Sequence, residues 1–263
     1  MILYKYMSLL GAKKVIETSS IGFTHLDDFN DPFECTSFGF KKESGSIKNP
    51  HGYKKRFSDK YAVLSLTRQP LNALMWSHYG DSHRGVVIGI DVDAAGFGSF
   101  SDNFIPYQSG EIIYTKTKSL NDLDICEDNL MAIGEDIVFD TNLFNLAKRA
   151  FLYKSLEWAY EEEVRVVKEV GSLKASYHNS EGEFGDFNII RMQGRPLWCF
   201  SIPKHSIKEV YLGKNVYENI SRTDTVRQGD YTALIESWQQ QGIQVNHCDV
   251  DYDSWNLSHR VKS

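Results

Sequence analysis

The feature that most constrains this fold is an excess of predicted strands over predicted helices. Short runs with alternating or continuous apolar residues predict strands at 1–6, 21–25, 61–67, 85–91, 112–114, 163–167, 187–192, 197–202, 207–212 and 243–250. Apolar residues at helical spacing predict helices at 8–18, 70–78, 122–136, 142–157 and 226–241. Parallel strands need long crossover connections, usually helices, and too few are predicted. The sequence therefore predicts an α+β fold with mixed or antiparallel sheets.

Length and composition bound the class of protein. The 263 residues predict a single domain over 1–263, with a helical insertion at about 121–157. A hydrophobic share of 41% and a charged share of 24% exclude a fully disordered chain. The net charge of −6 argues against coating nucleic acid by bulk charge. We expect a cytoplasmic protein for three reasons. The four cysteines are scattered, the N-terminus does not resemble a signal peptide, and no apolar run approaches ~20 residues.

Two segments depart from this average charge. Residues 41–60 hold seven basic and two acidic residues, a net +5, whereas 121–140 hold seven acids and no Lys or Arg. The basic segment is either a solvated loop or a clamp for phosphates. The acidic segment is either a solvated face or a docking surface for a basic partner. The candidates for contacting nucleic acid are Lys41, Lys42, Lys54, Lys55 and Arg56.

Three consecutive glutamates, 161–163, stand where a helix is predicted to end and a strand to begin. Negative charge at a helix C-terminus opposes the helix dipole, at a cost of about 0.3–1 kcal/mol per charge. Violations of local rules concentrate at functional sites. Alternate strand residues share a face, so we expect Glu161, Glu163 and Arg165 together and Glu162 opposite. The alternative is an exposed acidic turn with Arg165 in a salt bridge.

A second polar cluster follows the predicted strand 61–67, which ends in the hydroxyls of Ser65 and Thr67. Five aromatic or basic residues then fall just before the apolar strand 85–91: Trp76, His78, Tyr79, His83 and Arg84. Rings of this kind stack on nicotinamide or adenine, and an arginine binds phosphate bidentately. The alternative places Trp76 in the core, with His78 and Arg84 hydrogen-bonded to backbone groups where the strand begins.

Other common site chemistries lack their motifs. The sequence has no P-loop, GxGxxG, GxSxG or HExxH. The spacing of His78 and His83 is wrong for one helix face. A metal-dependent nuclease or hydrolase stays open as an alternative, with ligands gathered from Asp31, Glu34, His78, His83 and Glu163.

Four blocks stand in order along the first two thirds of the chain: Leu3-Tyr4-Lys5-Tyr6, FNDPFE at 29–34, MWSHYGDSHRGVVIGID at 75–91, and 154–165 with its YEEEVR ending. Together they resemble a widespread bacterial family known as a domain of unknown function. Their order is similar to the ADP-ribosyltransferase plan, with Arg or His on a first strand, Ser-Thr-Ser on a middle strand and Glu-x-Glu on a late strand. Here Lys5 or a tyrosine takes the first place, and Leu66 interrupts the hydroxyl motif.

The resemblance implies an ADP-ribosyltransferase-like β core and individual roles. Glu163 would stabilise the positive charge that develops on the ribose as the nicotinamide–ribose bond breaks. Glu161 would orient or deprotonate the acceptor. The residues implied to hold NAD are Tyr4, Lys5, Tyr6, Asn30, Ser65, Thr67, Trp76, His78, Tyr79 and Arg84.

The implied function is an NAD-dependent ADP-ribosyltransferase that modifies a nucleic acid, and we expect RNA rather than DNA as the acceptor. The resemblance further implies a toxin of an anti-phage toxin–antitoxin system, to which a cognate antitoxin protein would bind. Besides the metal-dependent hydrolase, a non-catalytic module that binds a partner through acid-rich helices at 121–157 remains an alternative.

Overall fold

The computed structural model describes residues 1–37, 54–55, 57–58, 60–118, 141–170, 182–184, 187–192, 194–217 and 228–261. The strands are β1 Ile2–Met7, β2 Ser20–Phe23, β3 Tyr61–Thr67, β4 Val86–Asp91, β5 Ile113–Thr115, β6 Tyr153–Ser155, β7 Glu163–Glu169, β8 Gly182–Phe184, β9 Phe187–Met192, β10 Arg195–Ser201, β11 Ile207–Leu212, β12 Gln244–Val250 and β13 Leu257–Val261. The helices are α1 Leu9–Thr18, α3 Ala73–His78, α5 Thr141–Leu152 and α7 Gln228–Gln240, with 3-10 turns η1 Leu26–Asp28, η3 Tyr107–Ser109, η4 Leu156–Glu161 and η6 Lys204–Ser206. None of the described helices has the length and apolar character needed to cross a membrane.

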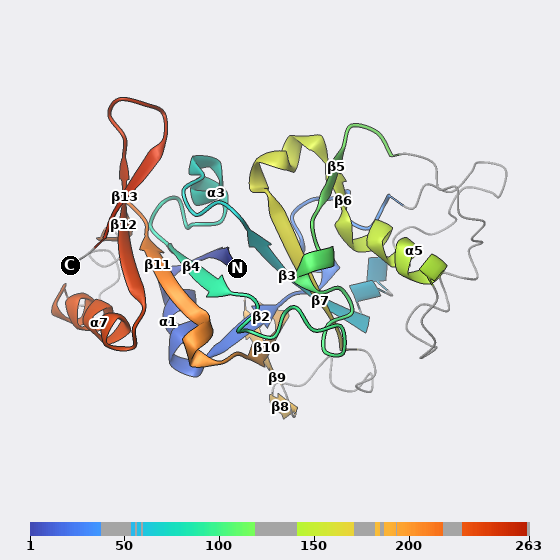
Figure 1. Ribbon diagram of the computed structural model, residues 1–263, viewed down its shortest axis with the longest axis horizontal. Helices are drawn as coiled ribbons and strands as arrows, with labels where there is room; N and C mark the ends of the chain where they lie inside the picture. The colour runs from blue at the N-terminus through green and yellow to red at the C-terminus, as the bar shows by residue number, and fades with distance from the viewer. Residues whose placement is uncertain are drawn as a thin grey trace.

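The described strands are mostly antiparallel, which confirms the predicted α+β class (Figure 1). The largest sheet has the order β13-β12-β11-β4-β1-β3-β7, and β11 and β12 within it run parallel. A second sheet has the order β2-β10-β9-β8, and β5 and β6 form a separate parallel pair. The β12–β13 hairpin projects at one end of the molecule, and α5 lies toward the other end.

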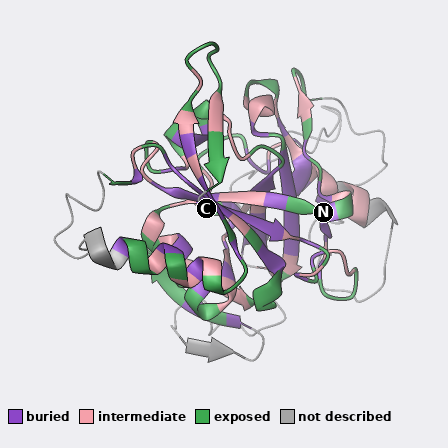
Figure 2. Cartoon of the chain, turned by 60° about the vertical axis from the view of Figure 1, so that its left-hand side comes forward, coloured by how far each residue is buried: buried purple, intermediate pink, exposed green. Residues whose placement is uncertain are grey.

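The main core joins the two larger sheets. Leu64 and Ile88 from the largest sheet belong to one apolar cluster with Phe23 and Trp198 from the second sheet, and each of these side chains is at most 2% exposed. Trp238 belongs to the same cluster, so α7 packs its apolar side inward. Figure 2 shows buried strands in the centre and an exposed outer side on α7. Burial of each large apolar side chain stabilises the fold by about 1.5–3 kcal/mol.

A second cluster lies on the other face of β3 and β7. Val63 and Val167 pack there with Ala147 and Phe151 of α5. Because alternate strand residues point to opposite faces, β3 and β7 are buried on both sides. This explains the nearly continuous apolar run of β3, whereas the valines of β7 alternate with buried charged residues.

The largest sheet opens between β1 and β3. The register of β1 with β4 contains six residue pairs, whereas that with β3 contains the pair Tyr4–Thr67. By contrast, the register of β3 with β7 contains seven pairs. The opening between β1 and β3 therefore leaves room for side chains of both strands.

Two predicted helices have other boundaries in the structure. The helix predicted at 142–157 ends at Leu152, because the next three residues pair with β5 as β6. The helix predicted at 70–78 begins at Ala73, because Asn72 caps it by accepting hydrogen bonds from two backbone N–H groups. The helix predicted at 122–136 lies outside the described residues.

Candidate active site

The opening between β1 and β3 is the mouth of a cleft of about 370 Å³. That volume is in the usual range for small-molecule sites. Side chains from β1, β3, η1, α3, β6, η4 and β7 line it, so distant parts of the sequence meet here. The lining residues are Tyr4, Lys5, Tyr6, Thr24, Asp28, Phe29, Asn30, Ser65, Leu66, Thr67, Met75, His78, Tyr79, Lys154, Glu161 and Glu163.

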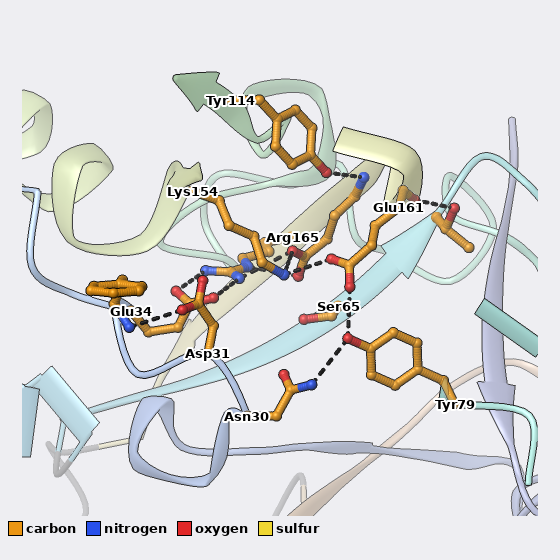
Figure 3. Close-up of polar contacts among 12 residues, drawn as sticks. Asn30, Asp31, Glu34, Ser65, Tyr79, Tyr114, Lys154, Glu161 and Arg165 are labelled. Carbon is orange, nitrogen blue, oxygen red and sulfur yellow. Dashed lines mark hydrogen bonds and ion pairs between the residues drawn. The ribbon is translucent and has the colours of Figure 1, made fainter. Parts of the chain in front are cut away.

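Glu161 and Glu163 both line this cleft and are 3% and 5% exposed. Figure 3 shows Glu161 with Lys154 and Tyr79. Glu162 between them is exposed, and its φ of 42° is in the left-handed region. This kink ends η4 and starts β7. The sequence expectation that Glu161, Glu163 and Arg165 share a surface is met in part, because the two glutamates line the cleft whereas Arg165 is buried and does not line it. The cause is different, because the kink at Glu162, rather than continuous strand alternation, brings the two carboxylates together.

Arg165 holds Glu163 from behind. The Arg165 guanidinium is fully buried, and it donates to both Glu163 oxygens at 2.7 and 3.1 Å. It also donates to both oxygens of Glu34 at 2.5 and 2.9 Å and to the Phe151 carbonyl. The Phe29 ring lies 4.8 Å from the guanidinium carbon. All five N–H donors of the arginine are thus used, which fixes the Glu163 carboxylate in one orientation.

Lys154 links the two cleft carboxylates. Its buried ammonium donates to Glu161 at 2.5 Å and to Glu163 at 3.2 Å. Burial lowers the pKa of Lys154, but the charges of Glu163 and Glu161 outweigh it and hold the pKa above its usual value. Lys154 is therefore a cation at neutral pH.

The two carboxylates have opposite pKa shifts. Burial alone would raise the pKa of Glu163, but the charges of Arg165 and Lys154 outweigh it and lower that pKa to about 2. Burial raises the pKa of Glu161, and the charge of Glu163 adds to this rise, while Lys154 opposes it. Neighbouring groups with divergent pKa values take different acid–base roles. Glu163 is a permanent anion, whereas Glu161 is the group suited to exchange a proton.

Tyr79 and Thr67 fix the position of Glu161. The Tyr79 hydroxyl donates to the Glu161 carboxylate at 2.6 Å, and the amide of Asn30 donates to the same hydroxyl at 3.3 Å. The Thr67 hydroxyl donates to the Glu161 carbonyl at 2.5 Å. Residues from three separate predicted blocks therefore meet at one carboxylate.

Lys5 lies between the splayed strands. Its ammonium donates to the Ser65 carbonyl at 3.0 Å, across the gap where β1 and β3 are no longer paired. Burial lowers the pKa of Lys5, although Glu163 and Glu161 act in the opposite direction. An ammonium has three donors, so a cleft ligand can accept from the others.

The structure brings eight of the ten predicted NAD-binding residues into the cleft lining. They are Tyr4, Lys5, Tyr6, Asn30, Ser65, Thr67, His78 and Tyr79. The Tyr4 hydroxyl donates to Glu209 and the Tyr6 hydroxyl to the Gln69 carbonyl, so both rings are held at fixed angles.

Trp76 and Arg84 do not line the cleft. Trp76 is fully buried, packs edge-on against Tyr6, and donates through its indole N–H to the Pro70 carbonyl. Arg84 donates to the Asp81 carbonyl and lies 3.7 Å from its carboxylate. Both side chains therefore have the structural roles of the alternative interpretation, in which Trp76 packs in the core and Arg84 bonds to backbone.

Most of the predicted nucleic-acid contacts fall on parts of the chain that the structure does not describe. Lys41, Lys42 and Arg56 lie outside the described residues, and so does the acid run 121–140. Lys55 is exposed, and Lys54 lies near enough to Asp28 of the cleft lining to affect its pKa. The proposed phosphate clamp at 41–60 therefore stays a prediction.

The ligands imagined for a metal centre do not converge. No three His, Cys, Asp or Glu side chains of the described chain are placed to hold a metal ion. Glu34 and Glu163 are instead paired with Arg165, and the His83 ring stacks against Trp76. Of the cysteines that the structure describes, Cys35 and Cys248 are buried and Cys199 is half-buried, and all three are free thiols.

Sequence reasoning missed the roles of Lys154 and Glu34. Lys154 begins the sequence block 154–165 but was given no chemistry, and Glu34 ends the block 29–34 but was considered only as a metal ligand. Asp28 and Phe29 of the cleft lining had no such assignment either.

One comparison with known proteins bears on this site. Residues 75–166 match the model of a family described as a protein of unknown function, DUF2971. The matched range contains the 75–91 block and the glutamates, whereas the blocks at 3–6 and 29–34 lie before it. No curated protein and no solved structure matches the chain. The chemistry of the cleft must therefore be inferred from its own geometry.

Proposed function

We propose that the protein is an ADP-ribosyltransferase that transfers ADP-ribose from NAD to a nucleic acid, with RNA as the acceptor. The observation that carries the proposal is the pair of glutamates with divergent pKa values in one cleft, facing the opening between β1 and β3. The strands β1, β3 and β7, which carry the motifs that resemble the ADP-ribosyltransferase plan, are neighbours in the largest sheet, and this supports the proposal. We therefore also propose an ADP-ribosyltransferase-like core.

Glu163 would provide electrostatic stabilisation. Breaking the bond between the ribose carbon and the nicotinamide nitrogen sends the bonding electrons to nicotinamide and leaves positive charge on the ribose. A carboxylate held ionised by Arg165 and Lys154 needs no reorganisation as this charge develops. Fixed groups of this kind are worth about 2.7–4 kcal/mol of barrier height.

Glu161 would handle the proton of the acceptor. A hydroxyl or amine that attacks the ribose carbon must lose a proton as the new bond forms. Glu161 has a raised pKa and an orienting hydrogen bond from Tyr79, so it suits that exchange. Lys154 donates hydrogen bonds to both glutamates and would hold the two carboxylates at a fixed distance from each other.

The remaining lining suits a dinucleotide. Lys5 supplies a cation for a pyrophosphate, and Ser65 supplies a hydroxyl beside Glu163 for a ribose. The rings of Tyr4, His78 and Tyr79 offer faces for the nicotinamide. The resemblance of the sequence blocks extends the proposal to a toxin of an anti-phage toxin–antitoxin system, with a cognate antitoxin as its protein partner.

The test uses NAD labelled in its adenine half, incubated with RNA, DNA or protein acceptors in the presence of EDTA. The proposal predicts label on RNA and none when NAD is omitted. Glu163→Gln should abolish transfer, whereas Glu162→Gln, a change at an exposed neighbour, should not. Because Glu163 pairs with buried Arg165, Glu161→Gln serves as a second variant that leaves that pair intact. Full transfer by both Glu163→Gln and Glu161→Gln would overturn the assignment.

A further inference from the structure

A second pocket of about 170 Å³ lies next to the cleft, beside β5 and β6. Among the residues that the structure describes, its lining contains Lys116, Lys118 and Lys154 and no Asp or Glu. That is a strong local bias in a chain with 35 acidic and 29 basic residues. The other lining residues are one phenylalanine, one tyrosine and four Ser or Thr residues.

Lys154 lines both this pocket and the cleft. Its ammonium reaches Glu161 and Glu163 on the cleft side, so a ligand in the second pocket lies one side chain away from the glutamates. A molecule that fills this pocket is therefore placed to present an attacking group to the cleft.

Cations and rings alternate along the pocket. The Phe33 ring is 59% exposed, and the Lys118 ammonium lies 5.3 Å from its centre. The Arg149 guanidinium lies 5.1 Å from the centre of the Tyr153 ring and donates to the Ser37 carbonyl at the pocket wall. Proteins bind single-stranded nucleic acids with this combination, in which cations follow the phosphates and rings stack on bases.

We propose that this pocket binds the acceptor RNA, with a backbone phosphate against Lys116 and Lys118 and a base stacked on Phe33. The inference rests on the proposed function, which it deepens by naming the acceptor site. Single-stranded RNA fits better than a duplex, because unstacked bases are what exposed rings recognise. The hydroxyls of Ser155 and Thr117 supply partners for a ribose 2′-OH.

The test measures binding of a fluorescently labelled 12-nucleotide single-stranded RNA by anisotropy, without NAD. Lys116→Glu/Lys118→Glu should weaken binding at least about tenfold near 0.1 M salt and reduce the salt slope of log K by about 1.4. Phe33→Ala should weaken binding at least about fivefold. The matched control is Lys14→Glu/Lys204→Glu, which changes two exposed lysines that line neither pocket and should leave binding unchanged.

NAD cleavage by water separates this inference from the proposed function. The Lys116→Glu/Lys118→Glu variant should release nicotinamide from NAD at the wild-type rate in the absence of acceptor, yet lose transfer to RNA. Unchanged RNA affinity in that variant, or tighter binding of an acidic peptide than of the RNA, would overturn the acceptor site while NAD cleavage still supported the enzyme. Loss of NAD cleavage in Glu163→Gln with RNA binding intact would support both.

Discussion

Replacing Glu34 by Gln should destabilise the whole protein, because it removes one of the two carboxylates that neutralise Arg165. The guanidinium is fully buried, and both Glu34 oxygens accept from it at 2.5 and 2.9 Å. A glutamine offers one oxygen acceptor, and its amide N–H groups would face the donors of the arginine. Leaving a buried charge partly unpaired costs about 3–5 kcal/mol.

Urea unfolding with a constant m-value gives the free energy of unfolding directly. We expect a loss of about 3–5 kcal/mol, which corresponds to a fall in Tm of about 6–20 °C in a domain of this size. The matched control is Glu236→Gln on α7, an exposed carboxylate, whose effect should stay within about 0.5 kcal/mol.

A double-mutant cycle with Arg165→Met isolates the pair itself. If the two side chains act through each other, the double variant should lose less than the sum of the two single losses, by about 0.5–3 kcal/mol. A loss below about 1 kcal/mol for Glu34→Gln, or additive losses in the cycle, would refute the view that Glu34 neutralises Arg165.

The side chains of the cleft and the backbone packed behind Arg165 give three further predictions. Tyr79→Phe removes a hydrogen bond that lowers the pKa of Glu161, so this pKa should rise in the variant. The acidic side of the pH–rate profile for transfer should therefore move to higher pH, and an unchanged profile would contradict this. Lys5→Met should raise Tm at neutral pH, because burial lowers the pKa of Lys5 and the fold therefore disfavours its charged form. The gain in Tm should shrink as the pH rises toward 10, where the wild-type lysine loses its proton in the unfolded chain too. A gain in Tm that grows with pH would contradict this direction of the pKa shift. Gly110→Ala would place a Cβ 1.8 Å from the Arg165 carbonyl and should cost at least about 1–3 kcal/mol in urea unfolding, whereas Gly96→Ala, with open space around it but φ of 77°, is a control for backbone strain alone.

Most strands and the class of fold could be predicted from local pattern, because β3 is a nearly continuous apolar run and β7 carries valine at three of its seven positions. The end of the helix at Leu152 could not, because β6 exists through pairing with β5, about forty residues earlier in the chain. Apolar periodicity carries no information on such a distant partner.

For the site, the alternation of β7 predicted that Glu163 and Arg165 share a face, but the approach of Glu161 depends on the left-handed kink at Glu162, which the spacing did not predict. The pairing of Arg165 with Glu34 spans 131 residues and leaves no trace in local sequence. Trp76 illustrates the opposite difficulty, since a tryptophan among polar neighbours suits a ligand cleft and a core equally well. Only the three-dimensional packing against Tyr6 distinguishes the two.

The central claim is that the ionised carboxylate of Glu163 lowers the barrier for breaking the nicotinamide–ribose bond. The most direct test is the rate of nicotinamide release from NAD by Glu163→Gln and by the matched control Glu162→Gln, with folding checked by Tm. Our account predicts a fall of about 10²–10³-fold for Glu163→Gln and a wild-type rate for Glu162→Gln. Equal rates in folded samples of the two variants would contradict it.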